Sequence, residues 1–438
     1  MANSQEQLKR TLGPVLLWGL GVGYVISGMY FGWNLGLPEG GTGGLAIATL
    51  FITIMYLTFT FSYTELACAI PRAGGAFDYA RKALGPEWGF VGGMAQNIEF
   101  IFAPPAIAFA IGAYLHILIP EIPVEVIAIG VYFIFTGINM YGVEAAASFE
   151  LLVTIIAVIG LLIFAGTTLP HFEYESLKQD AFPHGPFGIF AAIPFAIWFY
   201  LAIEGVANVA EETINPQRNV LIGFGAAIFT LVSLCILTFI SSIGVNGWET
   251  VVIDPQTNIS SDSPLPLVMA HILGAEHWLY KLLTFIGLFG LIASFHGIIL
   301  AAGRATLEFG REGFAPKFLG KIHPDRKTPV NALILNMVIG IIALLTGKTA
   351  DIITIACFGA LTLYIISMIS LFVLRKKDPQ LERPFKVPLY PYFPFTALVI
   401  AVVSLISISY FNPVLALSFS LESWFSYLVY SSINKPGK

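Results

Sequence analysis

The chain has 438 residues, of which 56% are hydrophobic and only 11% are charged, and its mean hydropathy is +0.80. A soluble fold of this length could not bury so much apolar surface, so the composition excludes a soluble protein and predicts a polytopic membrane protein. The formal net charge of −5 gives no reason to expect nucleic acid as a partner, and Cys68, Cys235 and Cys357 form neither a disulfide framework nor a metal site. We expect no metal and no cofactor.

Apolar runs of about 20 residues, the length that crosses a hydrocarbon core of about 30 Å, recur along the whole chain. They predict an all-α integral membrane protein with twelve transmembrane helices, at 12–33, 43–69, 87–118, 123–140, 147–168, 187–210, 219–244, 278–304, 328–346, 350–374, 389–411 and 412–430. The segment from Met1 to Arg10 is polar and lacks a cleavable signal pattern, so the first span should remain in the mature protein. The protein is therefore expected to have the lipid bilayer as its surroundings.

The distribution of basic residues predicts the orientation in the membrane. If the N-terminus is cytoplasmic, all but three of the 22 lysines and arginines fall in segments on the inner side, and the exceptions are Lys178, Lys281 and Lys348. This asymmetry agrees with the positive-inside rule for an even number of spans. We therefore expect a multi-pass protein of the cell (inner) membrane with both termini in the cytoplasm.

Two of the predicted spans carry interruptions that a plain membrane anchor would not need. Five glycines lie between Gly19 and Gly32, which favours either a broken helix or close packing between helices. The sixth span carries Glu204 at mid-depth, and a carboxylate there costs at least about 2.5–3.5 kcal/mol on insertion scales. Matched interruptions in two halves of a chain indicate a transporter site at the bilayer midplane.

We therefore predict breaks near Ile26–Gly28 and Trp198–Ala202 and a five-plus-five inverted repeat. The expected parts of the chain are a cytoplasmic N-terminus (1–11), a first repeat of spans 1–5 (12–168), a second repeat of spans 6–10 (187–374), spans 11–12 (389–430) and a cytoplasmic C-terminus (431–438).

Four short segments, in order, resemble motifs of the amino acid, polyamine and organocation (APC) transporter family. They are Ile26-Ser-Gly-Met-Tyr30 in span 1, Pro71-Arg-Ala-Gly-Gly-Ala-Phe-Asp-Tyr79 after span 2, Glu211-Glu-Thr-Ile-Asn-Pro-Gln-Arg-Asn-Val220 after span 6, and Arg311-Glu-Gly-Phe-Ala-Pro316 after span 8. Ile26 stands where the family often has a glycine. Within the family the chain is most similar to the ethanolamine permease group, through residues 29–35 and 203–212.

The resemblance implies a LeuT-like fold with spans 1 and 6 broken, and it implies site residues by position. The family holds the amino group of its substrate with backbone carbonyls of the broken helices, and the matching positions here are Tyr24, Trp198 and Leu201. Ala202, the next residue, is a further substrate-binding candidate. Ser27 and Gly28 stand where it holds a carboxylate, which for ethanolamine leaves only a hydroxyl to meet. Trp198 is also placed as a stacking aromatic, and Asn97 aligns with a site position.

Buried polar residues supply further candidates. Asn97 and Glu99 lie about 200° apart on a regular helix, so both cannot point into one pocket, and Glu99 is either a ligand or a protonated structural or coupling residue. Ser294 in span 8 is a substrate-binding candidate, and His296 is either a satisfied core histidine or a proton relay. Glu204, Glu99 and His296 are the candidates for proton coupling, because a buried carboxyl group can titrate near neutral pH.

These observations predict a secondary active transporter that imports a small amine cation, most closely ethanolamine, by alternating access with a proton as the coupling ion. An amino acid or polyamine permease or exchanger of the same family is the alternative within this class. A membrane sensor built on a transporter fold is the alternative from another class. An enzyme is not expected, because the seven histidines are scattered and no HExxH motif, Cys/His cluster or serine nucleophile elbow is present.

Overall fold

The computed structural model describes residues 10–72, 74–141, 146–255 and 258–433, and within them the chain is helical with no β-strand, as the sequence predicts. The α-helices and 3-10 helices (η) are α1 (Pro14–Val25), α2 (Ser27–Tyr30), η1 (Trp33–Gly36), α3 (Leu37–Ala69), α4 (Ala76–Leu84), α5 (Pro86–Leu118), α6 (Val124–Tyr141), α7 (Ala146–Thr168), η2 (Leu169–His171), η3 (Tyr174–Leu177), α8 (Gly185–Ala191), α9 (Ile193–Trp198), η4 (Ile203–Glu212), α10 (Pro216–Ile243), α11 (Glu249–Val252), α12 (Pro264–Leu273), α13 (Trp278–Arg311), α14 (Val330–Leu344), α15 (Thr349–Lys377), α16 (Tyr392–Phe411) and α17 (Pro413–Ile433).

Eight of the described helical segments are long and apolar enough to cross a membrane. They are Trp33–Ala69, Pro86–Leu118, Val124–Tyr141, Ser148–His171, Pro216–Ile243, Trp278–Arg311, Thr349–Lys377 and Tyr392–Phe411. The four other spans that the sequence predicts fall on α1–α2, α8–η4, α14 and α17, and the first three of these are interrupted or short. A helix satisfies its own backbone hydrogen bonds, which is why apolar runs of this length adopt it in lipid.

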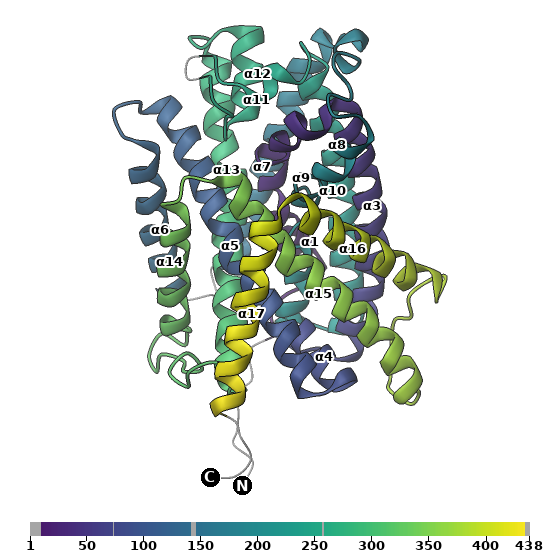
Figure 1. Ribbon diagram of the computed structural model, residues 1–438. Coiled ribbons are helices and arrows are strands. Elements are labelled where there is room, and N and C mark those ends of the chain that lie inside the picture. The colour runs from purple at the N-terminus through teal and green to yellow at the C-terminus, as the bar shows by residue number, and fades with distance from the viewer. Residues whose placement is uncertain (1–9, 73, 142–145, 256–257, 434–438) are drawn as a thin grey trace.

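The helices pack side by side into one bundle (Figure 1). The short helices α11 and α12 cover one end and α4 lies at the opposite end, while α6 and α14 form a flank and α17 runs along the front. In an apolar stretch of 18 residues, 78% of the residues of α13 and 78% of those of α15 are buried inside the protein. The corresponding share in α6 is 28%. The centre of the bundle is therefore built around α13 and α15, and α6 lies at its periphery.

Close backbone approaches hold the centre together. A Cβ atom at Gly359 of α15 would lie 2.6 Å from the carbonyl oxygen of Ala95 and 2.7 Å from the amide nitrogen of Glu99, so only glycine lets α15 lie this close to α5. Gly41 bends the start of α3, where its φ of 64° is a conformation that glycine adopts readily. The first contact fixes the position of Glu99 against α15.

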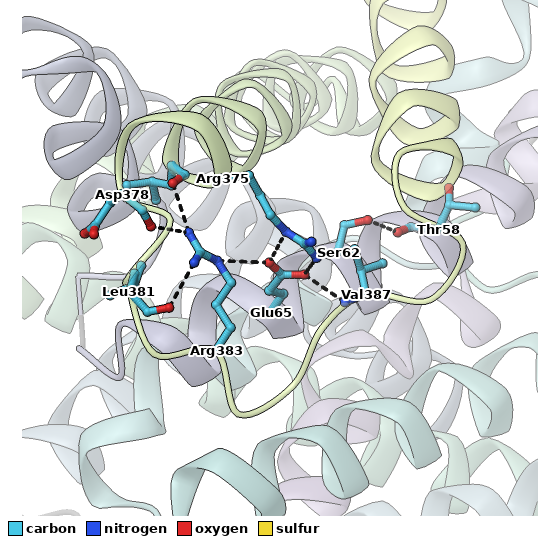
Figure 2. Close-up of polar contacts among 9 residues, drawn as sticks. Thr58, Ser62, Glu65, Arg375, Asp378, Leu381, Arg383 and Val387 are labelled. Carbon is cyan, nitrogen blue, oxygen red and sulfur yellow. Dashed lines mark hydrogen bonds and ion pairs between the residues drawn. The ribbon is translucent and has the colours of Figure 1, made fainter.

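A buried ion cluster ties α3 to α15 and to the segment that follows α15 (Figure 2). Glu65 of α3 has a side chain that is 1% exposed, and its carboxylate accepts two hydrogen bonds from Arg375, of 2.7 and 2.6 Å. Arg383 lies 3.4 Å from the same carboxylate, and the backbone N–H of Val387 donates to it at 2.8 Å. Bidentate pairing of this kind fixes both distance and orientation.

We expect replacement of Glu65 by Gln to lower the thermal unfolding midpoint of the purified protein strongly. The amide leaves two guanidinium groups without their carboxylate, and breaking a buried ion pair costs about 3–5 kcal/mol. Thermal unfolding in detergent measures the effect.

The matched control is Glu312→Gln, which removes the partner of Arg81 in an ion pair whose side chains are 32% and 44% exposed. A pair at the surface is worth about 0–1 kcal/mol, so this variant should unfold close to the wild-type midpoint. Equal midpoints for the two variants would contradict the structural role of the Glu65 cluster.

Candidate functional site

The helix that leads into Glu204 ends early. Helix α9 stops at Trp198, Ala202 adopts a left-handed conformation with φ of 73°, and the chain continues as the 3-10 helix η4. The interruption lies where the sequence predicts it. A left-handed alanine is a strained conformation, which persists only where the surrounding contacts fix it. One such contact is visible here, because the N–H of Ala202 donates to Oε1 of Glu99 at 3.2 Å.

The first helix is interrupted as well. Helix α1 ends at Val25 and α2 begins at Ser27, as expected, but the extended residue Phe31 and Gly32, with φ of 87°, lie further along the chain than the predicted break. Ser294 of α13 bridges this interruption. The N–H of Ser27 donates to its hydroxyl oxygen at 2.9 Å, and the hydroxyl donates to the carbonyl of Gly23 at 2.7 Å.

The two interruptions meet at Gly28. A Cβ atom at this position would collide with the carbonyl oxygen of Trp198, so the absence of a side chain lets α2 lie directly against the end of α9. The indole of Trp198 packs edge-on against Phe31, with ring centroids 5.4 Å apart, and its buried N–H has no partner among the described residues. The structure thus brings Ser27, Gly28, Trp198 and Ala202 into one region.

Two carboxyl groups face each other at this junction. Glu99 of α5 and Glu204 of η4 are 0% and 1% exposed, and their side chains are hydrogen-bonding neighbours. Oε2 of Glu99 and Oε1 of Glu204 have no other partner among the described residues. Because an ionised carboxylate only accepts hydrogen bonds, this contact needs a proton on one of the two groups. The Glu99–Glu204 pair then carries at most one net negative charge.

Two tyrosines complete the surroundings of the Glu99–Glu204 pair. The hydroxyl of Tyr364 on α15 donates to Oε2 of Glu204 at 3.0 Å, and the hydroxyl of Tyr56 on α3 lies 3.0 Å from that of Tyr364. In the sequence, nothing distinguishes Tyr56 and Tyr364 as site residues among the 17 tyrosines of the chain.

Asn97 points elsewhere. Its amide donates to the carbonyl of Gly93 at 2.8 Å, and its carbonyl oxygen accepts from Thr306 of α13 at 2.7 Å. It also lines a cavity of about 10 Å³ between α4, α5 and α13, together with Gln96 and Ala305. Asn97 and Glu99 therefore point in different directions, as their spacing on the helix predicts. Glu99, not Asn97, reaches the helix interruption.

Two other candidates, Tyr24 and His296, have different neighbours. Tyr24 is 1% exposed, and its ring lies against Gly205 and Gly297, where a Cβ atom would overlap it. His296 is not alone in the core, because its Nδ1 lies 3.2 Å from Oε2 of Glu150 on α7. The sequence analysis missed Glu150, although a carboxylate inside an apolar run of span 5 is the same signal that selected Glu204 and Glu99.

Contacts close the α4 side of the interrupted helices. Arg304 of α13 pairs with Glu212 of η4 at 2.9 Å, and the two side chains are 11% and 13% exposed. The backbone carbonyl of Glu212 accepts from Thr11 and Leu12, which precede α1. Since Trp198 and the two carboxyl groups are also nearly inaccessible, the structure is closed around the site.

Comparisons with known proteins show which family the chain resembles. A family model described as amino acid permease matches residues 15–433. An uncharacterized transporter of Rhizobium meliloti (strain 1021) is 27% identical over 98% of this chain and 91% of its own length. The branched-chain amino acid permease BcaP of Bacillus subtilis is 23% identical over 98% and 94%, and the low-affinity putrescine importer PlaP of Escherichia coli K12 is 27% identical over 85% and 83%.

These relatives are transporters and not enzymes, and the matched region extends over almost the whole chain, interruptions and buried carboxyl groups included. The chain therefore belongs to the amino acid permease family of the APC transporters.

Proposed function

We propose that this transporter imports a small primary-amine cation, most closely ethanolamine, across the inner membrane by alternating access, with the uptake coupled to protons. The observation that carries the proposal is the Glu99–Glu204 pair at the junction of the interrupted helices. With one of the two carboxyl groups ionised, the single negative charge of the buried site matches one ammonium group, because an uncompensated buried charge is costly.

The same pair argues against a zwitterionic amino acid as the preferred substrate. The carboxylate of the amino acid would add a negative charge close to Glu99 and Glu204, which already share a proton. Like charges that lie close together in a buried site repel strongly. Ethanolamine brings a neutral hydroxyl instead. The unpartnered N–H of Trp198 is a donor for that hydroxyl, and the indole face suits an ammonium.

A diamine is the second candidate, because the relative PlaP is named as a putrescine importer. Putrescine has two ammonium groups separated by four methylene groups, so it needs a second, separate negative site. Glu99 and Glu204 lie together and supply one site only, which favours a monoamine.

The architecture proposed for this mechanism is the five-plus-five inverted repeat with twelve spans. The interruptions between α1 and α2 and between α9 and η4 would then occupy equivalent places in residues 12–168 and 187–374. Contact between them at Gly28 and Trp198 supports a site at the interface of the two repeats.

Ethanolamine should stabilise the purified protein against thermal unfolding more than neutral amino acids do. A ligand at about 100 times its Kd adds about 2.7 kcal/mol to the stability of the state that binds it. Thermal-shift measurements with ethanolamine, putrescine, leucine and arginine test the substrate class. Stabilisation by leucine and not by ethanolamine would overturn the proposal, and stabilisation by putrescine alone would select the diamine.

Replacement of Glu204 by Gln should weaken the binding of ethanolamine and remove the coupling to protons. The amide keeps the shape and the hydrogen bond from Tyr364, but it cannot ionise, and a hydrogen bond to a charged group is worth about 1.5–3 kcal/mol, or about 10- to 100-fold in Kd. In proteoliposomes, the variant should still exchange labelled for unlabelled ethanolamine at high concentration, yet no longer accumulate it under a pH gradient.

Glu422→Gln is the matched control, because Glu422 is an exposed carboxylate of α17 outside the site. It should accumulate ethanolamine like the wild type. Undiminished accumulation by the Glu204→Gln variant would show that the coupling proton is carried elsewhere, with Glu99 and His296 as the remaining candidates.

A further inference from the structure

A second pair of ionisable groups is buried away from the amine site. Glu150 of α7 and His296 of α13 have side chains that are 1% and 3% exposed, and Nδ1 of His296 lies 3.2 Å from Oε2 of Glu150. The imidazole is otherwise surrounded by aromatic rings, with the centroid of Phe149 at 5.8 Å and that of Phe135 at 6.1 Å. The Glu150–His296 pair therefore occupies an apolar contact between two helices.

The number of protons decides whether this pair carries a net charge. With one proton, either on the carboxyl group or shared as an ion pair, Glu150 and His296 are neutral together. Loss of that proton leaves a lone carboxylate, and gain of a second leaves a lone imidazolium. Either state places an unpaired charge in an apolar interior, which costs several kcal/mol unless water reaches it. The closed structure therefore requires one proton on the pair.

The pair lies directly against the first interrupted helix. Oε1 of Glu150 has no hydrogen-bond partner among the described residues, and a Cβ atom at Gly23 of α1 would lie 2.5 Å from it. One turn further along α7, the hydroxyl of Thr154 donates to the carbonyl of Gly19 at 3.3 Å. The carbonyl of Gly23 itself is held by Ser294, two residues before His296 on α13. A charge on Glu150 would therefore lie directly at the contact of α1 with α7 and α13.

We infer that Glu150 and His296 form a proton-binding site, separate from the amine site, whose proton holds α1 against α7 and α13. With the proton, the contact is neutral and closes. Without it, the carboxylate favours a conformation in which α1 moves away and water enters from the α4 side. The inference rests on the alternating access proposed above, in which α1 moves, but not on the identity of the amine.

The other ionisable groups near this site do not replace the pair. Tyr24 of α1 also interacts electrostatically with Glu150, and Arg304 and Glu212 pair with each other between α13 and η4. Glu99 and Glu204 of α5 and η4 act on each other. In the described part of the chain, His296 is the ionisable group that pairs with Glu150.

Exchange at equal pH on both sides tests the inference, because such exchange needs no net proton movement. Proteoliposomes are loaded with saturating unlabelled ethanolamine, and the uptake of labelled ethanolamine is measured from about pH 6 to about pH 9. The wild-type rate should fall at the alkaline end, by up to about tenfold per pH unit for loss of one proton. The Glu150→Gln variant should show no alkaline fall, because glutamine hydrogen-bonds to His296 without ionising.

Three controls separate this site from its neighbours. Thr154→Val removes a hydroxyl from the same face of α7 but no titratable group, so it should keep the wild-type pH profile. Glu204→Gln should also keep the alkaline fall, because its effect lies at the amine site. The double variant Glu150→Gln/His296→Gln should be as independent of pH as Glu150→Gln alone, since the two residues act as one site.

A second measurement does not depend on the substrate. In a background without Cys68, Cys235 and Cys357, a cysteine at Ala305, which is 7% exposed and lines the cavity on the α4 side, reports access of water from that side. Labelling by a thiol reagent should rise with pH more steeply in the otherwise wild-type protein than in the Glu150→Gln variant. The thiol itself titrates equally in both proteins, so the difference between them reports the effect of Glu150.

The outcomes are distinct. If the wild type exchanges ethanolamine and the Glu150→Gln variant shows the same alkaline fall and the same labelling profile, the inference is wrong while the proposed function stands. If the wild type exchanges no amine, the proposed function fails, and the labelling profile alone decides whether Glu150 and His296 bind the controlling proton.

Discussion

The need to satisfy backbone amides and carbonyls inside a membrane shapes the centre of this protein. A continuous helix meets that need alone, but α1–α2 and α9–η4 are interrupted, so side chains from other helices must take over. Ser294 bridges the first interruption, and Glu99 accepts from Ala202 at the second. The groups that stabilise the irregular backbone are therefore the same groups that define the site.

That double role explains why buried carboxyl groups are tolerated here. Glu99 is anchored by a backbone N–H and Glu204 by Tyr364, and each carboxyl group keeps one oxygen with no other partner among the described residues. The arrangement remains incomplete without a proton or a cation. Under the proposed function, a closed and largely apolar site with a single ionised carboxyl group favours a substrate with one positive charge.

Charge is also placed in layers along the bundle. The Glu65 cluster ties the α4 end of α3 to α15 through ion pairs with two arginines, and the Arg304–Glu212 pair joins α13 to η4. The Glu99–Glu204 and Glu150–His296 pairs contain groups whose charge depends on protons. Ion pairs with arginine suit parts that hold the structure together, whereas the Glu99–Glu204 and Glu150–His296 pairs are the ones to which we assign protons in the proposals above.

The sequence by itself predicted the class, most of the helices and the interruption before Ile203, and it made Glu204 a candidate, because hydropathy, glycine spacing and a buried carboxylate act through local chemistry. It separated Asn97 from Glu99 by their angle on a helix but could not choose between them. Only the tertiary structure decided that Glu99 meets Glu204, that Tyr364 completes the pair and that Glu150 is the partner of His296. These contacts join residues 105 to 160 positions apart, and no local pattern encodes which helices become neighbours.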